Sequence, residues 1–169
     1  VAVGLAAVFM LTSGPADEVE PEQNRKRIWS FDMRDLHRVE IELADGRSEE
    51  WFAEARGWYF DRPGLPLVDM DRWGGGVPHL LSGPAASRLI SDDVAAEDLV
   101  IFGLDPPRMK LHLEYGEGPE ILDIAIGDPT PDDVSYYLKL AGRSSIFTID
   151  YTWYDIMERL IVEPLYKPE

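Results

Sequence analysis

An alternating pattern near the centre of the chain places the strongest constraint on its fold. Apolar residues alternate with charged or polar ones from Met109 to Tyr115, and a glycine-containing turn follows at 116–118. Period-two alternation is typical of a strand with one buried face. Three more strands are expected beyond that turn, at 120–126, 134–140 and 146–149. The pattern therefore predicts a four-stranded antiparallel meander.

A helix is expected directly after this meander. Asp150 is a good N-cap residue, because its carboxylate can accept a hydrogen bond from the first helical turn. Apolar residues then recur at helical spacing and form one stripe: Trp153, Ile156, Met157, Leu160 and Ile161. Such a stripe is buried when the helix lies across a sheet.

A second meander is expected earlier in the chain, with strands at 36–43, 48–54 and 58–60. Between the meanders, prolines and glycines make 61–84 irregular, with at most a short helical turn at 68–73. A strand is expected at 85–90, followed by a helix at 94–102 that Asp92 or Asp93 caps and Gly103 ends. The predicted fold class is α+β: two antiparallel β-meanders with a few short helices, preceded by one transmembrane helix.

The first twelve residues carry no charge, whereas the chain is acidic from Asp17 onward. Spanning a bilayer takes roughly 20 apolar residues, so 1–12 is interpreted as the C-terminal part of a transmembrane helix. A cleaved signal peptide is the alternative, and it stays open here. The expected membrane anchor consists of Val1, Val3, Leu5, Val8, Phe9 and Leu11.

The expected domain organisation follows from these segments. An acidic, proline-rich tether at 13–27 precedes a first lobe at 28–84, and a second lobe at 85–162 precedes a tail at 163–169. The two meanders share a strand–glycine turn–strand pattern. An internal duplication and a chance match of alternating sequences are both compatible with that similarity.

Composition narrows the classes of partner. The chain has 32 acidic and 16 basic residues, for a formal net charge of −16. This charge repels phosphate backbones, so nucleic acid is not an expected partner, whereas basic protein surfaces are. The chain has no cysteine, which excludes disulfides and thiolate chemistry.

The sequence contains no clear motif for metal binding or nucleophilic catalysis. His37, His79 and His112 do not have metal-binding spacing, and no nucleophile-elbow motif is present. The acidic clusters at 69–71, 92–93 and 128–133 do not have the order of a calcium loop, and turn or cap chemistry explains them. No catalytic, cofactor-binding or metal-binding residue is therefore predicted, and no small-molecule ligand is indicated.

Aromatic residues in the first lobe suggest a contact surface, because Trp and Tyr combine a large contact area with a low entropy cost. The partner-contact candidates are Trp58, Tyr59, Phe60, Leu65, Trp73 and Val77.

Several ordered motifs resemble a known family. They are Phe102-Gly103-Leu104-Asp105-Pro106-Pro107, Ile126-Gly127-Asp128-Pro129-Thr130-Pro131-Asp132 and Tyr137-Leu138-Lys139-Leu140-Ala141-Gly142, with Ile28-Trp29-Ser30-Phe31-Asp32 and Gly57-Trp58-Tyr59-Phe60 upstream. Together they resemble the domain of unknown function numbered 4340, over about residues 28–162. The family usually has a helix where this chain has Trp73 to Pro78. The resemblance implies a bitopic, extracytoplasmic domain, linked in some members to gliding-type transporters, and no established catalytic residue.

The expected function is that of a non-enzymatic accessory subunit, anchored in the bacterial inner membrane with its domain on the periplasmic side. It would dock on a larger respiratory, photosynthetic or transport complex, and its partners would be integral membrane proteins and lipid. An auxiliary ligand-binding component of a gliding-type ABC exporter is the alternative, and a hydrolase with an unseen site is the third possibility.

Overall fold

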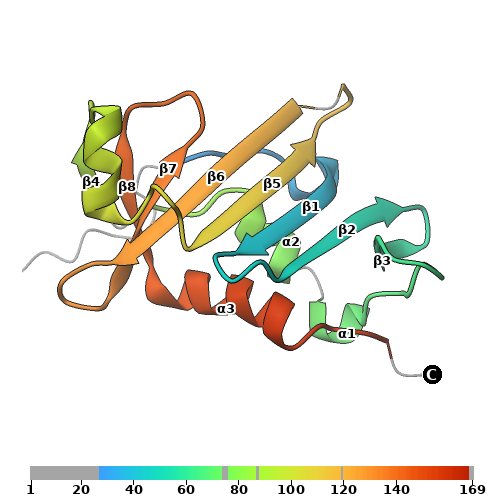
Figure 1. Ribbon diagram of the computed structural model, residues 1–169. Coiled ribbons are helices and arrows are strands. Elements are labelled where there is room, and N and C mark those ends of the chain that lie inside the picture. The colour runs from blue at the N-terminus through green and yellow to red at the C-terminus, as the bar shows by residue number, and fades with distance from the viewer. Residues whose placement is uncertain (1–26, 74–75, 87, 119, 168–169) are drawn as a thin grey trace, which may run out of the picture.

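One antiparallel sheet dominates the computed structural model, which describes residues 27–73, 76–86, 88–118 and 120–167 (Figure 1). The sheet has eight strands in the spatial order β3-β2-β1-β5-β6-β7-β8-β4. With its few short helices, it confirms the predicted α+β class in coarse terms. The strands are β1 (Leu36–Leu43), β2 (Ser48–Glu54), β3 (Gly57–Phe60), β4 (Arg88–Ser91), β5 (Met109–Tyr115), β6 (Glu120–Pro129), β7 (Ser135–Leu140) and β8 (Ile146–Asp150).

Five short helical elements surround the sheet within the described ranges. The α-helices are α1 (Met70–Trp73), α2 (Gly76–Leu81) and α3 (Tyr151–Val162), and the 3-10 helices are η2 (Met33–Asp35) and η3 (Ala96–Phe102). The predicted meander corresponds to β5–β8 and is confirmed. The predicted final helix is α3, and its N-cap is confirmed because the Asp150 carboxylate accepts a hydrogen bond from Thr152 N at 2.8 Å.

The two meanders are joined edge to edge. Strand β1 pairs with β5 along nearly its whole length, from Leu36 opposite Tyr115 to Leu43 opposite Met109. The two lobes expected from the sequence are thus two halves of one continuous sheet. Their apolar residues form a single core cluster that runs from β3 to β8.

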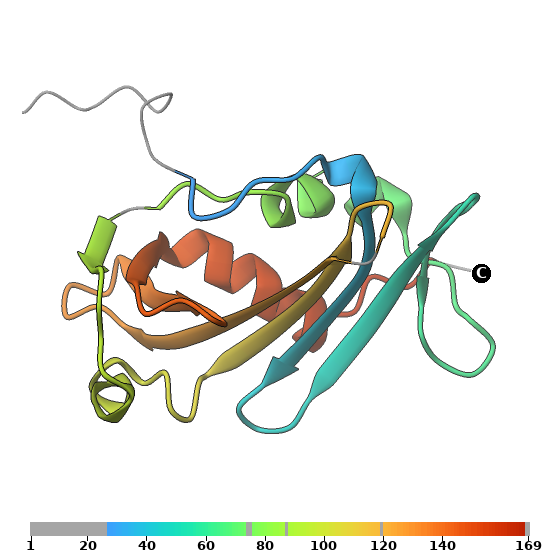
Figure 2. The ribbon, with the colours of Figure 1, turned by 90° about the horizontal axis from the view of Figure 1, so that it is seen from above.

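One face of this sheet is covered. The helix α3 lies across it and buries Trp153, Met157 and Leu160 against inward-facing strand residues. The segment 27–35 and the helices α1 and α2 lie on the same side, and the sheet curves around α3 (Figure 2). Burial of this apolar layer is the main source of stability for the fold.

The opposite face is covered only in part. Alternation places Tyr136 toward α3, where it stacks on Tyr154, and Tyr137 on the other side, where it packs edge-on against Phe102. The helix η3 therefore lies on the other side of the sheet from α3, near β7 (Figure 2). Over β1, β2 and β5 this face carries polar side chains that no described helix covers.

Two predictions for the connecting segments are wrong in detail. The segment 61–84 contains α1, as expected, but also α2, which begins at Gly76 and contains Pro78. Proline is tolerated in the first helical turn because its missing N–H has no partner there. The predicted helix at 94–102 is the 3-10 helix η3, and Ala95 precedes it without a side-chain cap from Asp92 or Asp93.

The expected membrane anchor at 1–12 and all of the tether except residue 27 lie outside the described residues. Within the residues that are described, no helix has both the length and the apolar character needed to cross a bilayer.

A backbone contact fixes the segment after η3 on the sheet. Gly103 has a φ of +62°, a left-handed conformation that favours glycine, and it ends η3 as predicted. The carbonyl oxygen of Phe102 then lies against Gly127 of β6, where a Cβ atom would be only 2.1 Å from it. Only glycine allows this approach. The motif at 102–107 thus contacts the motif at 126–132.

Replacing Gly127 with alanine tests this contact. The added methyl would collide with backbone rather than with a movable side chain, so we expect Gly127→Ala to lower the free energy of unfolding by about 2–3 kcal/mol. Urea denaturation followed by circular dichroism measures the change.

Gly118→Ala is the matched control. Apart from its chain neighbours, no atom of the described residues lies within 4 Å of the point where a Cβ atom on Gly118 would stand. Its effect should therefore stay within about 0.5 kcal/mol. Equal effects of the two substitutions would contradict the close contact at Gly127.

Candidate functional site

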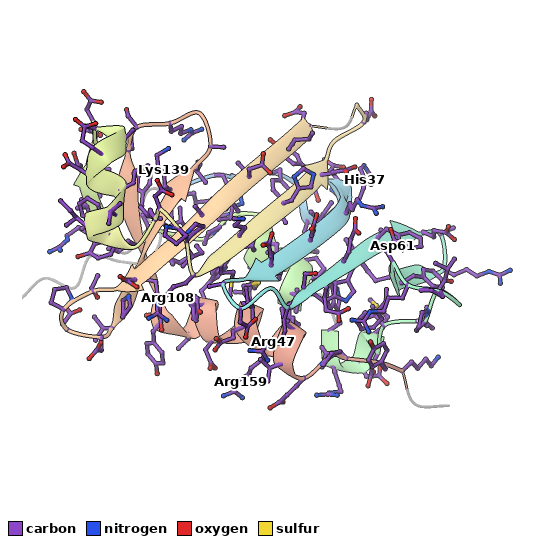
Figure 3. All side chains as sticks on the ribbon, viewed as in Figure 1. His37, Arg47, Asp61, Arg108, Lys139 and Arg159 are labelled. Atoms are coloured by element: carbon purple, nitrogen blue, oxygen red, sulfur yellow. The ribbon has the colours of Figure 1, made fainter. Side chains whose placement is uncertain are left out.

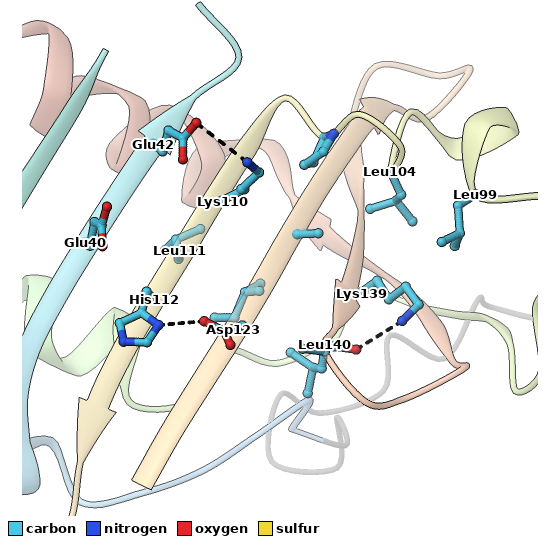
Figure 4. Close-up of a pocket in the computed structure, with 14 residues that line it drawn as sticks. Glu40, Glu42, Leu99, Leu104, Lys110, Leu111, His112, Asp123, Lys139 and Leu140 are labelled. Carbon is cyan, nitrogen blue, oxygen red and sulfur yellow. Dashed lines mark hydrogen bonds and ion pairs between the residues drawn. The ribbon is translucent and has the colours of Figure 1, made fainter. Parts of the chain in front are cut away.

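The uncovered face contains a hollow of about 450 Å³ (Figure 4). Strands β1, β5, β6 and β7 form its floor, and η3 with the segment that follows forms one wall. The wall side chains are Leu99, Leu104 and Pro107. Gly127 lets Phe102 approach β6, and the backbone hydrogen bond from Arg108 N to the Ile126 carbonyl oxygen at 2.8 Å holds the segment after η3 on the sheet.

Two rows of side chains cross the floor, because residues directly opposite each other in neighbouring strands share a face. In the first row Glu42 lies opposite Lys110, Lys110 opposite Ala125, and Ala125 opposite Lys139. The methyl group of Ala125 thus lies between two lysines. In the second row Glu40 lies opposite His112, and His112 lies opposite Asp123.

The charged groups of the floor differ in how they are paired. Lys110 Nζ lies 3.6 Å from a carboxylate oxygen of Glu42, which is a loose ion pair. His112 Nδ1 lies 2.6 Å from Asp123 Oδ1. Lys139 Nζ donates to the Leu140 carbonyl oxygen at 3.3 Å and has no carboxylate partner within the described part of the chain.

The pKa of His112 is raised above its usual value. The principal cause is the hydrogen bond to Asp123; partial burial opposes it, and the charges of Asp123, Glu114 and Glu40 add to it. The imidazole therefore holds its proton to a higher pH than a free histidine would. A protonated His112 donates to Asp123 and offers no free base to the hollow.

The structure places the predicted partner-contact residues in two environments. Trp58, Phe60, Trp73 and Val77 are at most 8% exposed and belong to the core, so their side chains are not available at the surface. The rings of Trp58 and Trp73 have centroids 5.6 Å apart. This burial corrects the prediction for four of the six residues. Trp73 and Val77 belong to the segment after β3, which folds back over the sheet and packs against Trp58 and Phe60.

The other two candidates are accessible. Leu65 is 49% exposed, and Tyr59 is partly exposed and stacks on Phe52 with centroids 5.7 Å apart. Alternation along β2 places Phe52 on the face opposite Trp51, so the Phe52–Tyr59 pair lies on the uncovered face with the hollow.

Sequence reasoning missed a buried acid. Glu49 is 5% exposed and pairs with Arg62, while its Oε2 atom has no partner among the described residues. The signal was present in the sequence, because Glu49 is in phase with the inward-facing Trp51 along β2. The indole nitrogens of Trp51 and Trp73 also lack partners within these residues.

Three of the remaining sequence candidates have local roles. His37 Nε2 bonds the Gly116 carbonyl oxygen at 2.8 Å, Asp69 accepts from Asp71 N at 3.1 Å, and Asp128 pairs with Arg108 at 2.8 Å. In the described ranges, His and acidic side chains do not gather into any group of three that could hold a metal ion. The glycine run at 74–76 resembles a phosphate-binding loop only in its glycines, because no Lys-Ser/Thr follows it, and Gly74 and Gly75 lie outside those ranges.

Comparison with known proteins supports the resemblance noted above. The family model for "Domain of unknown function (DUF4340)" matches residues 80–160. The DUF4340 match runs from α2 to α3 and includes the wall of the hollow, the Phe102–Gly127 contact and β5–β7. It is shorter than the extent of 28–162 expected from the motifs. Neither a curated protein nor a solved structure matches the chain.

The burial of Trp73 yields a stability prediction. Trp73→Ala removes a ring that is 2% exposed, so we expect a loss of about 3–5 kcal/mol in the free energy of unfolding. Leu65→Ala, at a position 49% exposed, should change it by less than about 0.5 kcal/mol. Chemical denaturation of both variants measures the difference. A small effect at Trp73 would contradict its place in the core.

The His112–Asp123 pair yields a pH prediction. The folded-state pKa of His112 is raised, so the His112–Asp123 pair stabilises the folded state when His112 is protonated. This stabilisation is fully present below pH 6.5 and is lost as the pH rises through the folded-state pKa. Asp123 is 55% exposed, so solvent screening limits this contribution to about 0.5–1 kcal/mol. Asp123→Asn should lower the His112 pKa, as measured by NMR titration of the imidazole protons. Asp128→Asn, which removes the partner of Arg108, should leave it unchanged. An unaltered His112 titration in Asp123→Asn would contradict the assignment.

Proposed function

We propose that this protein is a non-enzymatic accessory subunit, anchored in the bacterial inner membrane, whose acidic domain docks on a larger integral membrane complex from the periplasmic side. The observation that carries the proposal is the uncovered face of the sheet over β1, β2 and β5. Antiparallel sheets commonly leave one face open to solvent, and this face is therefore accessible to a second protein surface.

The charge on this face favours a basic partner. Figure 3 draws the side chains on the ribbon, and Lys139 is labelled there. Alternation along the strands assigns it these acidic and basic residues: Glu40, Glu42, Glu50, Glu54, Glu114 and Asp123, with Arg38, Lys110, His112 and Lys139. Within the described ranges, Glu40 and Glu54 have no ion-pair partner. Unpaired carboxylates steer a basic surface toward the face and disfavour an acidic one.

The uncharged residues 1–12 support the membrane part of the proposal. An anchor confines the domain to the membrane plane and raises its effective concentration near integral membrane partners. A weak interface on the sheet face is then sufficient for stable association.

The lining of the hollow supplies no hydroxyl or thiol nucleophile among the described residues. It contains the His112–Asp123 pair but no serine, threonine, cysteine or tyrosine among the described residues. A histidine–aspartate pair activates a neighbouring hydroxyl or thiol in nucleophilic enzymes, and the lining supplies neither.

The alternative role is that of an auxiliary ligand-binding component of a gliding-type ABC exporter. The hollow itself favours this role, because its volume of about 450 Å³ is in the range of small-molecule sites.

Mild detergent extraction of the full chain from native membranes tests the docking role. We expect integral membrane proteins to co-purify with the wild-type chain, and the yield to fall about fivefold with Glu40→Lys, as for one charge contact worth ~1 kcal/mol. Glu163→Lys is the matched control, since Glu163 follows α3, which packs on the covered face. A chain that purifies alone would overturn the proposal, and co-purification with a permease and an ATPase would favour the exporter role.

A further inference from the structure

We propose that the hollow binds a small organic anion with an apolar body, whose carboxylate is held above Ala125 between Lys110 and Lys139. This inference goes beyond the docking role, because it assigns a ligand class to a site on the domain itself. It rests on the size of the hollow, its lining and the pairing of its charged groups.

The size and lining suit a ligand of this class. Small-molecule sites typically have volumes of about 300–1,000 Å³ and mostly apolar walls with a few polar groups. The hollow measures about 450 Å³, and Leu99, Leu104, Pro107 and Ala125 supply apolar surface. An aryl or alkyl group against these side chains would be removed from water at a gain of roughly 25 cal/mol per Å².

The charge pattern selects an anion. In a chain of net charge −16, most basic groups near the hollow already have an acidic partner. Arg108 pairs with Asp128 and His112 pairs with Asp123. Lys139 bonds only a carbonyl oxygen among the described residues, and it borders the open volume of the hollow. An incoming carboxylate would give this ammonium the charged partner that the described chain does not supply.

The position of Ala125 locates the carboxylate. Lys110 and Lys139 lie directly opposite Ala125 on its two neighbouring strands. Strands are spaced about 4.8 Å apart, so the lysine backbones are roughly 10 Å apart. The short alanine side chain leaves the space between them open. Both flexible lysine side chains can bend toward an anion there, and the Lys110–Glu42 pair at 3.6 Å is loose enough to be exchanged.

The ligand also has a defined orientation. Leu99 and Leu104 stand beside Lys139 on the wall side, as Figure 4 shows. The opposite side, toward β1, carries Glu40 and Glu42, which repel a carboxylate. The anionic group therefore lies at the lysines, and the apolar body lies against the wall.

A set of three probes with one carbon skeleton tests the proposal: 3-phenylpropionate, 3-phenylpropan-1-ol and 3-phenylpropan-1-ammonium. Each is titrated into the ¹⁵N-labelled full chain, and amide chemical shifts are followed by NMR. We expect saturable shifts at 125, 139 and 104 for the carboxylate, and affinity at least about tenfold lower for the alcohol and the ammonium. Equal affinities for the three probes, or carboxylate shifts only at other residues, would overturn the proposal.

Substitutions test separately the role of the Lys139 charge and the role of the open space above Ala125. Lys139→Gln should weaken 3-phenylpropionate binding about tenfold, Lys139→Arg should restore most of it, and Ala125→Leu should abolish it by filling the gap. Lys167→Gln, near the C-terminus, is the matched control and should bind like wild type. The dispersion of the amide spectrum shows whether each variant is folded. A folded Lys139→Gln or Ala125→Leu variant that binds like wild type would contradict the site, whatever the outcome of the membrane extraction.

Discussion

The antiparallel pairing of β1 with β5 is the interaction on which the rest of this structure depends. It joins a three-stranded meander to a four-stranded one, and so it turns two narrow sheets into one that is wide enough to curve around α3. A small meander alone buries little apolar surface and is marginally stable. Joined through Val39 opposite Leu113 and Ile41 opposite Leu111, the two halves share one core beneath α3.

The two faces of this sheet differ because alternation along each strand directs apolar side chains to one face and most charged side chains to the other. The covered face holds the aromatic and aliphatic core, including the tryptophans that the sequence suggested as partner contacts. The other face holds paired and unpaired charges, and the segment after η3 lies on it because Gly127 has no side chain. The absence of a Cβ atom there lets Phe102 and Leu104 lie close to β6, and Leu104 lines the hollow together with Lys139. The proposed docking surface and the proposed anion site both follow from leaving this face uncovered.

Much of the fold could be predicted from local pattern. Period-two alternation located β5–β8, and the Asp150 cap with its apolar stripe located α3, because these signals act over a few residues. The β1–β5 pairing could not be predicted, since alternation does not specify which edges meet. The helix α2 was missed because glycine and proline near its start mask a short helix. The burial of Trp58 and Trp73 could not be predicted, because it depends on which distant segments pack over these rings. The row Lys110–Ala125–Lys139 could not be predicted either, because it depends on the register between neighbouring strands.

Native-state hydrogen exchange across the β1–β5 boundary tests the central claim most directly. If the eight strands form one cooperative sheet, the slowest amides of β1, β2, β5 and β6 should exchange with the same free energy of opening, and low denaturant should lower all of them together. The account would be contradicted if β1–β3 opened on their own, with a lower free energy of opening than β6–β8. In that case the β5 amides that face β1 would lose protection together with β1–β3, while β6–β8 stayed protected.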